Sequence, residues 1–415
     1  MLLLALAGCA PKSPLSPPAP GSRDPCQLAA DSAERLDTFT VALPDSIDLA
    51  HAPQPTNEGE RLLFRQLFET LVRLDCQGEI RPGLATTWFP DSTGRIWTFV
   101  LRSGTSFPDG SALTTTSVVS SWRSRWPALQ AVGLDSIKAL DEQRLVVTVR
   151  DRRDSLPHLF ADPLLSVTNP AGSAAASHGG MAVALASGPP VLAAEVSPNG
   201  DLRDALDSGA DLVISGDPAV IEYASARSEF ETFLLPWSRT YALLQRAGTE
   251  AVEGKTYDDS VRQSLARDAV QTEARPTRSP YWWTLPCAAS TSNRVTVPLA
   301  ARILYPRNDR VARQLAERII ALAGDSLQLR AVGLGPAAFA DALEKGTDHG
   351  YIVALPFRPV SPCREAAQWT GGTRIEPLID TRARAIVRRG SPPLTVDWDG
   401  IVRILYDDIA SEVRP

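Results

Sequence analysis

The chain contains none of the short motifs that mark the common catalytic sites. There is no GxSxG nucleophile elbow, no HExxH zinc motif, no phosphate-binding P-loop, and no GxGxxG between a strand and a helix. Histidine is also scarce: His51, His158, His178 and His349 are scattered and do not cluster near the cysteines. These absences predict a protein that is not an enzyme, binds no metal and carries no cofactor.

Basic runs are missing as well. The 415 residues carry a formal net charge of −6, and no cluster of lysine or arginine offers an electrostatic footprint for nucleic acid. No internal repeat is visible. With 44% hydrophobic and 22% charged residues, the composition is that of a globular protein with enough material for more than one core.

The N-terminal residues indicate where the protein works. Residues 1–7 are apolar but far too few to span a membrane, which takes about 20 residues. The sequence Leu-Ala-Gly-Cys that ends at Cys9 resembles a bacterial lipobox, so we expect residues 1–9 to be a lipoprotein signal and Cys9 to carry lipid. Because the run lacks a basic beginning, we expect the true start codon upstream of Met1. The proline-rich residues 10–35 are expected to form an extended linker.

A helix is predicted after Asn57. Asn57 and Glu60 have the spacing of a capping box, in which each side chain satisfies a backbone N–H at the start of a helix. Apolar residues then repeat at helical spacing as far as Leu71. We therefore expect a helix that ends at residues 71–75.

Strand signals follow. Residues 97–102 alternate apolar and polar positions, which indicates a strand with one buried face, and Trp97 and Phe99 are expected in the core. Turn sequences stand on both sides, at residues 91–94 and 109–110. Elsewhere strands are predicted at residues 38–43, 145–149, 327–332 and 351–355, and helices at residues 259–268 and 311–322.

The order of sequence features between residues 57 and 122 resembles a known family. The features are LVRLD at 71–75, GEI at 78–80, PGLA at 82–85, Trp88, WTFVLR at 97–102 and DG at 109–110. This order resembles the extracellular solute-binding proteins of family 5, the oligopeptide-, dipeptide- and nickel-binding type that serve ABC importers. The resemblance implies an α/β, two-lobed periplasmic-binding-protein fold of class II type, with an extra α+β subdomain in the first lobe.

The resemblance also implies how the chain is divided. Lobe I would comprise residues 36–56, 161–245 and 375–415, its subdomain residues 57–160, and lobe II residues 246–374. Between Trp369 and Glu376 there is almost no chain, whereas the family usually carries a long helical stretch there. We therefore expect a shortened lobe II and a shallower cleft.

Ligand-binding residues can be nominated by their position in the family pattern. These are Asn57 near the entry segment, Trp237, Arg239 and Tyr241 on a strand close to the hinge, and Trp369 as a wall of lobe II. Trp237 would cover an apolar part of a ligand, and Arg239 would pair with a carboxylate through its planar fork. The alternative is that Trp237 is a core residue and Arg239 a solvated charge at a strand edge.

The remaining cysteines are expected to form disulfides. With Cys9 assigned to lipid, Cys26, Cys76, Cys287 and Cys363 remain, and four cysteines allow three pairings. We favour Cys26–Cys76 and Cys287–Cys363, because each pair lies within one expected lobe. Metal binding is the alternative, but the spacings are wide and none is CxxC.

The resemblance implies a binding function. We expect a lipid-anchored, monomeric substrate-binding protein in the periplasm or at the cell surface, which captures a peptide or other small solute by hinge closure and works with ABC permease subunits. A second hypothesis is a diverged lipoprotein that keeps this fold and acts as a sensor or scaffold without transport. A third is a secreted hydrolase, which would need catalytic residues outside the motifs considered above.

Overall fold

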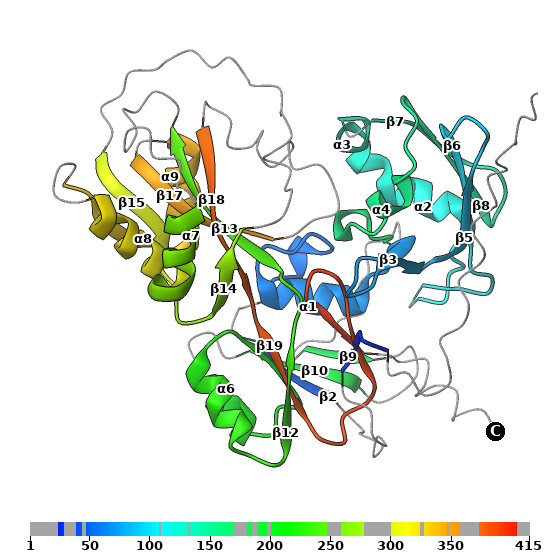
Figure 1. Ribbon diagram of the computed structural model, residues 1–415. Helices are drawn as coiled ribbons and strands as arrows, with labels where there is room; N and C mark the ends of the chain where they lie inside the picture. Colours follow the sequence, from blue (N-terminus) through cyan, green and yellow to red (C-terminus); the bar gives the residue numbers. More distant parts are fainter. Residues whose placement is uncertain are drawn as a thin grey trace, which may run out of the picture.

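The computed structural model describes a large part of the chain in separate stretches. They are residues 24–28, 39–43, 47–107, 109–131, 133–168, 181–184, 190–196, 201–246, 259–277, 300–323, 328–346, 348–356 and 373–404. Within them, two six-stranded sheets of mixed direction and a four-stranded antiparallel sheet form the centres of three bodies (Figure 1). We call these lobe I, lobe II and the subdomain.

The sheet of lobe I has the strand order β12-β19-β11-β2-β10-β9. Its strands are β2 (Phe39–Leu43), β9 (Met181–Ala184), β10 (Pro190–Val196), β11 (Leu212–Ser215), β12 (Phe230–Leu234) and β19 (Arg384–Arg388). β2 runs parallel to β10 and β11, whereas β19 is antiparallel to β11 and β12. Helix α1 (Glu58–Leu67) packs on one face, and α5 (Leu202–Asp207) and α6 (Pro218–Ser225) pack on the other. The sheet is therefore buried on both sides, as parallel strands require.

Helix α1 is shorter than the sequence pattern predicts. Its N-cap is Asn57, whose Oδ1 accepts a hydrogen bond from the Glu60 N–H at 2.8 Å. The helix ends at Leu67, and Phe68 is already extended. The prediction of a helix as far as residues 71–75 is wrong, because Val72–Leu74 forms strand β3 and its apolar side chains enter the subdomain core.

The subdomain is built on an antiparallel sheet of order β5-β6-β8-β7. Its elements are β3, β4 (Ile80–Pro82), β5 (Ala85–Pro90), β6 (Ile96–Leu101), α2 (Thr115–Trp122), α3 (Trp126–Ala131), β7 (Leu134–Ala139), β8 (Arg144–Val149) and α4 (Leu156–Leu159). Trp97 and Phe99 are buried, as predicted, and Phe99 contacts Phe160 with ring centroids 5.0 Å apart. Trp122 stacks on the same Phe160 ring at 5.4 Å. Aromatic packing thus holds the helices onto one face of the sheet.

Lobe II contains the other six-stranded sheet, of order β14-β18-β13-β17-β15-β16. Its strands are β13 (Arg239–Arg246), β14 (Glu273–Pro276), β15 (Ala300–Pro306), β16 (Arg330–Leu334), β17 (Asp348–Pro356) and β18 (Thr373–Arg382). Helices α7 (Asp259–Ser264) with a π-helical turn (Leu265–Ala269) and α8 (Arg310–Ala323) cover one face, and α9 (Pro336–Lys345) packs on the other. β15 is parallel to β16 and β17.

The described chain passes between the two large sheets at residues 235–238 and at Ala383. These crossings lie side by side, since the Leu235 N–H donates to the Ala383 carbonyl at 3.1 Å and the Ser238 N–H donates to the Thr381 carbonyl at 3.2 Å. Two adjacent extended segments have the form of a hinge.

Sheet pairing moves the expected domain boundaries. β13 and β18 pair with each other and lie wholly in lobe II, so residues 239–245 and 375–382 belong to that lobe and not to lobe I. Helix α1 packs in the core of lobe I, so the subdomain begins after it. The subdomain core also extends beyond residue 160, as far as Val167.

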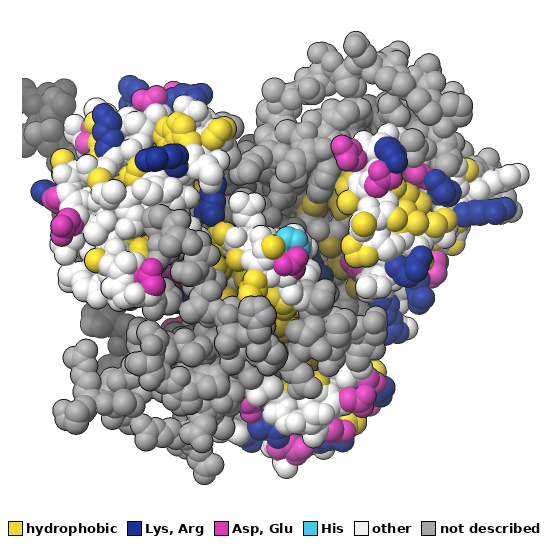
Figure 2. All heavy atoms as spheres, turned by 180° about the vertical axis from the view of Figure 1, so that it is seen from behind, with side chains coloured by type: hydrophobic (Ala, Val, Ile, Leu, Met, Phe, Trp, Pro, Cys, Tyr) yellow, Lys and Arg dark blue, Asp and Glu magenta, His cyan; other side chains and the backbone are white. Residues whose placement is uncertain are grey.

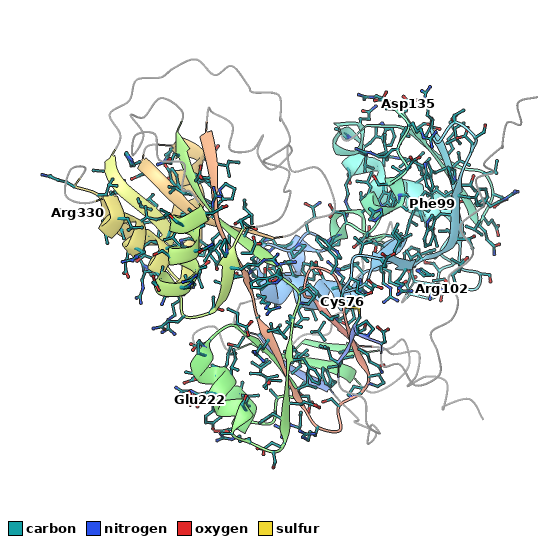
Figure 3. The ribbon with its side chains drawn as sticks, in the orientation of Figure 1. Cys76, Phe99, Arg102, Asp135, Glu222 and Arg330 are labelled. Carbon is teal, nitrogen blue, oxygen red and sulfur yellow. A yellow bond between two sulfur atoms is a disulfide. The ribbon has the colours of Figure 1, made fainter. Side chains whose placement is uncertain are left out.

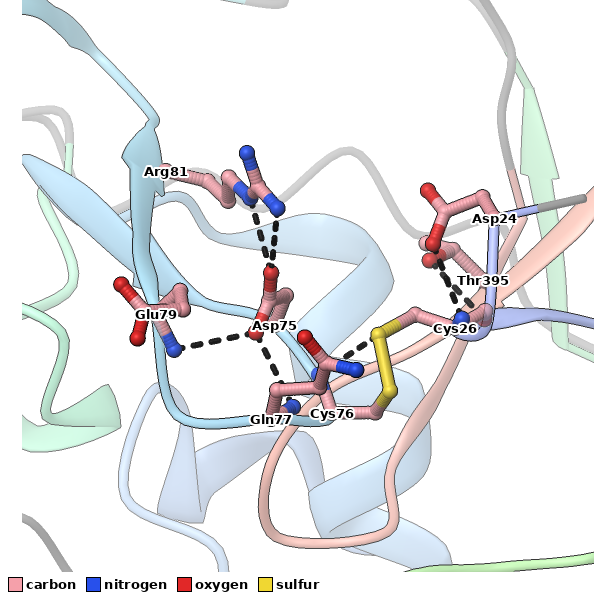
Figure 4. The surroundings of a disulfide bond; sticks show 8 residues. All are labelled: Asp24, Cys26, Asp75, Cys76, Gln77, Glu79, Arg81 and Thr395. Atoms are coloured by element: carbon pink, nitrogen blue, oxygen red, sulfur yellow. Dashed lines mark hydrogen bonds and ion pairs between the residues drawn. A yellow bond between two sulfur atoms is a disulfide. The ribbon is translucent and has the colours of Figure 1, made fainter. Parts of the chain in front are cut away.

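A small sheet ties the start of the described chain to its end. β1 (Gln27–Leu28) pairs with β20 (Leu394–Val396), which pairs with β21 (Val402–Ile404). The expected Cys26–Cys76 disulfide is present and joins this sheet to the turn between β3 and β4 (Figure 4). The Asp75 carboxylate shapes that turn by accepting hydrogen bonds from the N–H groups of Gln77 and Glu79.

Short 3-10 turns complete the architecture. They are Leu49–His51, Arg123–Arg125 and Pro163–Leu165.

Phe99 lies inside the subdomain, whereas Glu222 and Arg330 project outward at the rims of lobes I and II (Figure 3). Figure 2 shows acidic and basic side chains interspersed over the described part of the opposite face, without a large field of one sign.

Candidate interlobe ligand site

The two large sheets face each other through the carboxyl ends of their parallel strands. In lobe I, Ser215 at the end of β11 pairs with Arg384, directly after the crossing at Ala383. In lobe II, Pro356 at the end of β17 pairs with Arg239, directly after the crossing at residues 235–238. In open α/β sheets ligands bind outside the carboxyl ends of the strands. The hinge therefore places two such edges opposite one another.

Helix N-termini from both lobes meet at this junction. α1 and α6 belong to lobe I and begin after Asn57 and Asp217, and α8 belongs to lobe II and begins after Asp309. The Asp217 side chain accepts from the Ala219 N–H at 2.9 Å, and the Asp309 side chain accepts from the Ala312 N–H at 2.9 Å. The N-terminal end of a helix carries partial positive charge, which suits such acidic caps.

Arg239 reaches across the junction. Its Nη2 lies 2.8 Å from Oε1 of Glu58, the first residue of α1, and the two side chains are 29% and 37% exposed. The same Glu58 oxygen accepts from Arg61 Nη1 at 2.8 Å. Burial opposes ionisation of Glu58, but the charges of Arg239 and Arg61 outweigh it and lower the pKa of Glu58 to about 2. The structure thus brings Arg239 to Glu58, the residue that follows Asn57.

A buried charge network fixes α1 in lobe I. Arg65 donates to Asp397 at 2.7 Å and to Asp399 at 2.8 Å, and Arg61 also donates to Asp399 at 3.1 Å. Burial penalises ionised Asp399, yet the charges of Arg65 and Arg61 keep its pKa low. Because these groups are paired, they hold α1 against the turn before β21. The position of Glu58, at the start of the same helix, is thereby fixed at the junction.

Tyr241 is buried in this state. It is 3% exposed and lies in the core beneath α8. Its hydroxyl lies 3.0 Å from the nearer Asp309 oxygen, and burial together with the Asp309 charge raises the pKa of Tyr241. Tyr241 therefore positions the start of α8, and its ring is not part of the exposed surface at the junction.

Trp237 lies in the first crossing segment. The guanidinium carbons of Arg275 and Arg382 each lie 4.3 Å from its ring centroid, within cation–π range. Arg382 also pairs with Glu273 at 3.0 Å, and Glu273 binds Arg384 of lobe I at 2.7 Å. Trp237 is thus packed among arginine side chains at the hinge.

Asn57 and Glu60 organise the entry segment. Asn57 caps α1, while the Glu60 carboxylate accepts from the backbone N–H groups of Asp48 and Thr56 at 3.1 and 2.7 Å. Glu60 also lies 2.8 Å from His51 Nδ1, and this hydrogen bond raises the pKa of His51. The loop before α1 is therefore held in place beside Glu58.

The sequence patterns missed Glu58, Asp217, Asp309 and Arg310. Asp217 and Asp309 cap helices, and Glu58 and Arg310 are the first residues of helices, which are ordinary places for polar and charged residues. The contacts of Glu58, Asp217 and Arg310 with the other lobe are therefore not visible in the sequence. Four of the predicted residues, Cys9, Cys287, Cys363 and Trp369, lie outside the described residues. Within the described ranges, His, Cys, Asp and Glu nowhere gather in a set of three that could hold a metal ion.

No helix in the described stretches combines the length and the apolar character that crossing a bilayer requires.

Two lobes with facing carboxyl edges, joined by adjacent crossing strands, define the two-lobed periplasmic-binding-protein fold. Comparison with solved structures confirms this fold. The Escherichia coli murein tripeptide binding protein MppA superposes with a TM-score of 0.63 at 14% identity, over 90% of this chain and 98% of that chain. Haemophilus influenzae OppA in complex with RPPGFSPFR gives 0.63 at 13% identity, over 86% and 95%. Brucella suis NikA in complex with Fe(III)-EDTA gives 0.60 at 14% identity, over 85% and 95%.

Sequence comparison confirms the resemblance to the family. Residues 79–197 match the family model of bacterial extracellular solute-binding proteins, family 5 Middle. The periplasmic murein peptide-binding protein MppA of Escherichia coli (strain K12) is 41% identical over 80 residues, which are 19% of this chain and 14% of that protein. The periplasmic oligopeptide-binding protein OppA of the same strain is 36% identical over 64 residues, 15% of this chain and 12% of that protein. The sequence alignments therefore span less than a fifth of these curated relatives.

Proposed function

We propose that the protein is the substrate-binding component of an ABC importer and captures a small solute between lobes I and II. The observation that carries this proposal is the meeting of two carboxyl strand edges at a hinge of two adjacent crossings. A ligand that touches both lobes only in the closed arrangement shifts the hinge equilibrium by its differential affinity. Capture of this kind needs no bond to be made or broken.

We propose a short peptide as the ligand class. By their names, MppA and OppA bind a murein peptide and oligopeptides. A peptide presents a cationic amine and an anionic carboxylate, and the junction offers a partner for each in Glu58 and Arg239. Arg239 would bind the carboxylate through its guanidinium fork, and Glu58 would bind the amine.

A thermal-shift screen of the full chain against di- to pentapeptides tests the proposal. A peptide at a hundredfold excess over its Kd stabilises the folded protein by about 2.7 kcal/mol, which raises the melting temperature. Arg239→Gln should abolish this shift, whereas Arg267→Gln, an exposed α7–π-turn arginine of the same lobe, should retain it. Silence across the panel and in native mass spectrometry would support a sensor or scaffold instead.

We also propose lipid anchoring through Cys9, a monomeric state, and placement in the periplasm or at the cell surface. The Leu-Ala-Gly-Cys sequence and the proline-rich linker support the anchor. The protein is expressed behind an added lipoprotein signal sequence in cells that are fed an alkyne fatty acid. The wild type should become labelled, and Cys9→Ser should remain unlabelled. Co-purification with a permease expressed from a neighbouring gene would test the importer partnership.

A further inference from the structure

Ion pairs between charged residues of the two lobes span the junction. Besides Glu58–Arg239, Arg310 Nη1 of α8 lies 3.0 Å from Asp217 Oδ2 at the start of α6. Glu273 of β14 lies 2.7 Å from Arg384 Nη2 of β19. Each pair takes an acid from one lobe and an arginine from the other. Arg239 and Arg384 directly follow the crossings, whereas Arg310 lies on α8, so separation of the lobes would break the Asp217–Arg310 contact.

The position of Arg310 is unfavourable within its own lobe. Arg310 is the first residue of α8, where the partial positive charge of the helix end repels a cation. Its Nη2 also donates to Gln271 Oε1, which holds the guanidinium on the lobe II side. Asp217 of lobe I is held in turn by capping α6. Contacts within each lobe therefore orient both side chains. The negative charge that stabilises Arg310 comes from Asp217 of the opposite lobe.

Contact at this place is close. A Cβ atom added to Gly216 would lie 2.6 Å from Oγ1 of Thr272, so the backbone before α6 lies against the Thr272 side chain, just before β14. The ion pair thus accompanies a packed contact between the lobes. The side chains of Arg310 and Asp217 remain 52% and 37% exposed, so salt can screen them.

We propose that the Asp217–Arg310 ion pair is an electrostatic latch that holds the two lobes together, and that these two residues thereby set ligand affinity. The inference rests on the proposed function in that it requires the lobes to move about the hinge. Because the latch stabilises the arrangement in which the lobes touch, its loss shifts the population toward separated lobes. Apparent affinity falls in proportion to the fraction of molecules with joined lobes, since only that fraction is competent to bind.

Distance measurement on the ligand-free full chain tests the latch. Spin labels carried on non-canonical amino acids at Glu222 and Arg330, exposed positions on the two lobes, report the interlobe distance by double electron–electron resonance (Figure 3). Asp217→Asn keeps the helix cap and removes the charge, and Arg310→Gln removes its partner. Each should raise the separated fraction relative to the joined fraction by about 1.4- to fivefold, the range that corresponds to about 0.2–1 kcal/mol for an exposed pair.

The double variant should show no larger effect than either single variant, because both remove the same interaction. Matched controls are Asp201→Asn, the N-cap of α5 that pairs with Arg203 in lobe I, and Arg313→Gln, which pairs with Glu317 within α8. Both controls should leave the distance distribution unchanged. Raising the salt to 1 M should separate the lobes of the wild type toward the distribution of the double variant.

Two outcomes overturn the latch and are distinguishable from failure of the proposed function. If a peptide shifts the wild-type distribution but Asp217→Asn and Arg310→Gln do not differ from the controls, the protein binds by closure and the latch is wrong. If the distribution is identical in all variants, at every salt concentration and with every peptide, the lobes do not move, and hinge closure is wrong as well.

Discussion

The ion pair between Glu58 and Arg239 should contribute to stability in a pH-dependent way. Their charged atoms lie 2.8 Å apart and join the two lobes, so unfolding of either lobe breaks the pair. A pKa of about 2 for Glu58, against an ordinary value of 4.5, would correspond to about 3 kcal/mol if fully realised. Because Glu58 is 37% exposed, solvent screening reduces our expectation to about 1 kcal/mol.

A double-mutant cycle isolates the part of this energy that depends on Arg239, because Arg61 also lowers the pKa of Glu58. The wild type, Glu58→Gln, Arg239→Gln and the double variant are unfolded with urea at pH 7 and at pH 2. The folded-state pKa of Glu58 is lowered, so its contribution is present above pH 4.5 and is lost as the pH falls toward 2. We expect a coupling of about 1 kcal/mol at pH 7 that shrinks strongly at pH 2.

The control cycle uses Glu231 and Arg389, an exposed pair within lobe I whose charged atoms are 4.0 Å apart. It should give a coupling near zero at both pH values. If the Glu58–Arg239 coupling is equally small at pH 7, or if it is unchanged at pH 2, then the electrostatic account of the junction is refuted.

Three further perturbations test other parts of the structure, each by urea unfolding of the full chain. Cys26→Ala with Cys76→Ala opens a crosslink that spans 50 residues, so the unfolding free energy should fall by about 4 kcal/mol, and a loss below about 1 kcal/mol would contradict a stabilising disulfide. Phe99→Ala removes a fully buried ring and should cost about 3–5 kcal/mol, whereas Phe89→Ala, at a side chain 52% exposed in the same sheet, should change stability by less than about 0.5 kcal/mol. Tyr241→Phe deletes a buried hydroxyl that donates to Asp309 and should cost about 1.5–3 kcal/mol, while the matched Tyr223→Phe at the surface should be close to neutral. If the two variants of either matched pair lost the same unfolding free energy, burial would not be the cause of the loss.

Much of the fold was predictable because local and tertiary preferences agree. Residues 97–102 alternate and form β6 with one buried face, and residues 311–322 repeat at helical spacing and form α8. The end of α1 was not predictable in this way. Apolar residues at 71, 72 and 74 fit the helix period, but they are buried as a strand in the subdomain core. Tertiary packing outweighed the local pattern there.

The candidate site was only partly predictable for a different reason. The family pattern indicated the strand that contains Arg239 and Tyr241, but β13 is buried on both faces, with Tyr241 in one core and Ala242 in another. A strand of this kind shows no alternation, so the sequence does not reveal which side chain points where. The partners Glu58 and Asp217 are far from Arg239 and Arg310 in the sequence. Glu58 is the first residue of α1 and Asp217 caps α6, and acidic residues are common at both positions, which hides their contacts with the other lobe.

The small sheet formed by β1, β20 and β21 determines how mechanical load enters the molecule. A pull on the chain before Asp24 would pass through β1 into β20, and through the Cys26–Cys76 bond into the β3–β4 turn. Neither route includes the segments at residues 235–238 and Ala383. A tether at this end would therefore place no tension on the two crossing segments that join the lobes.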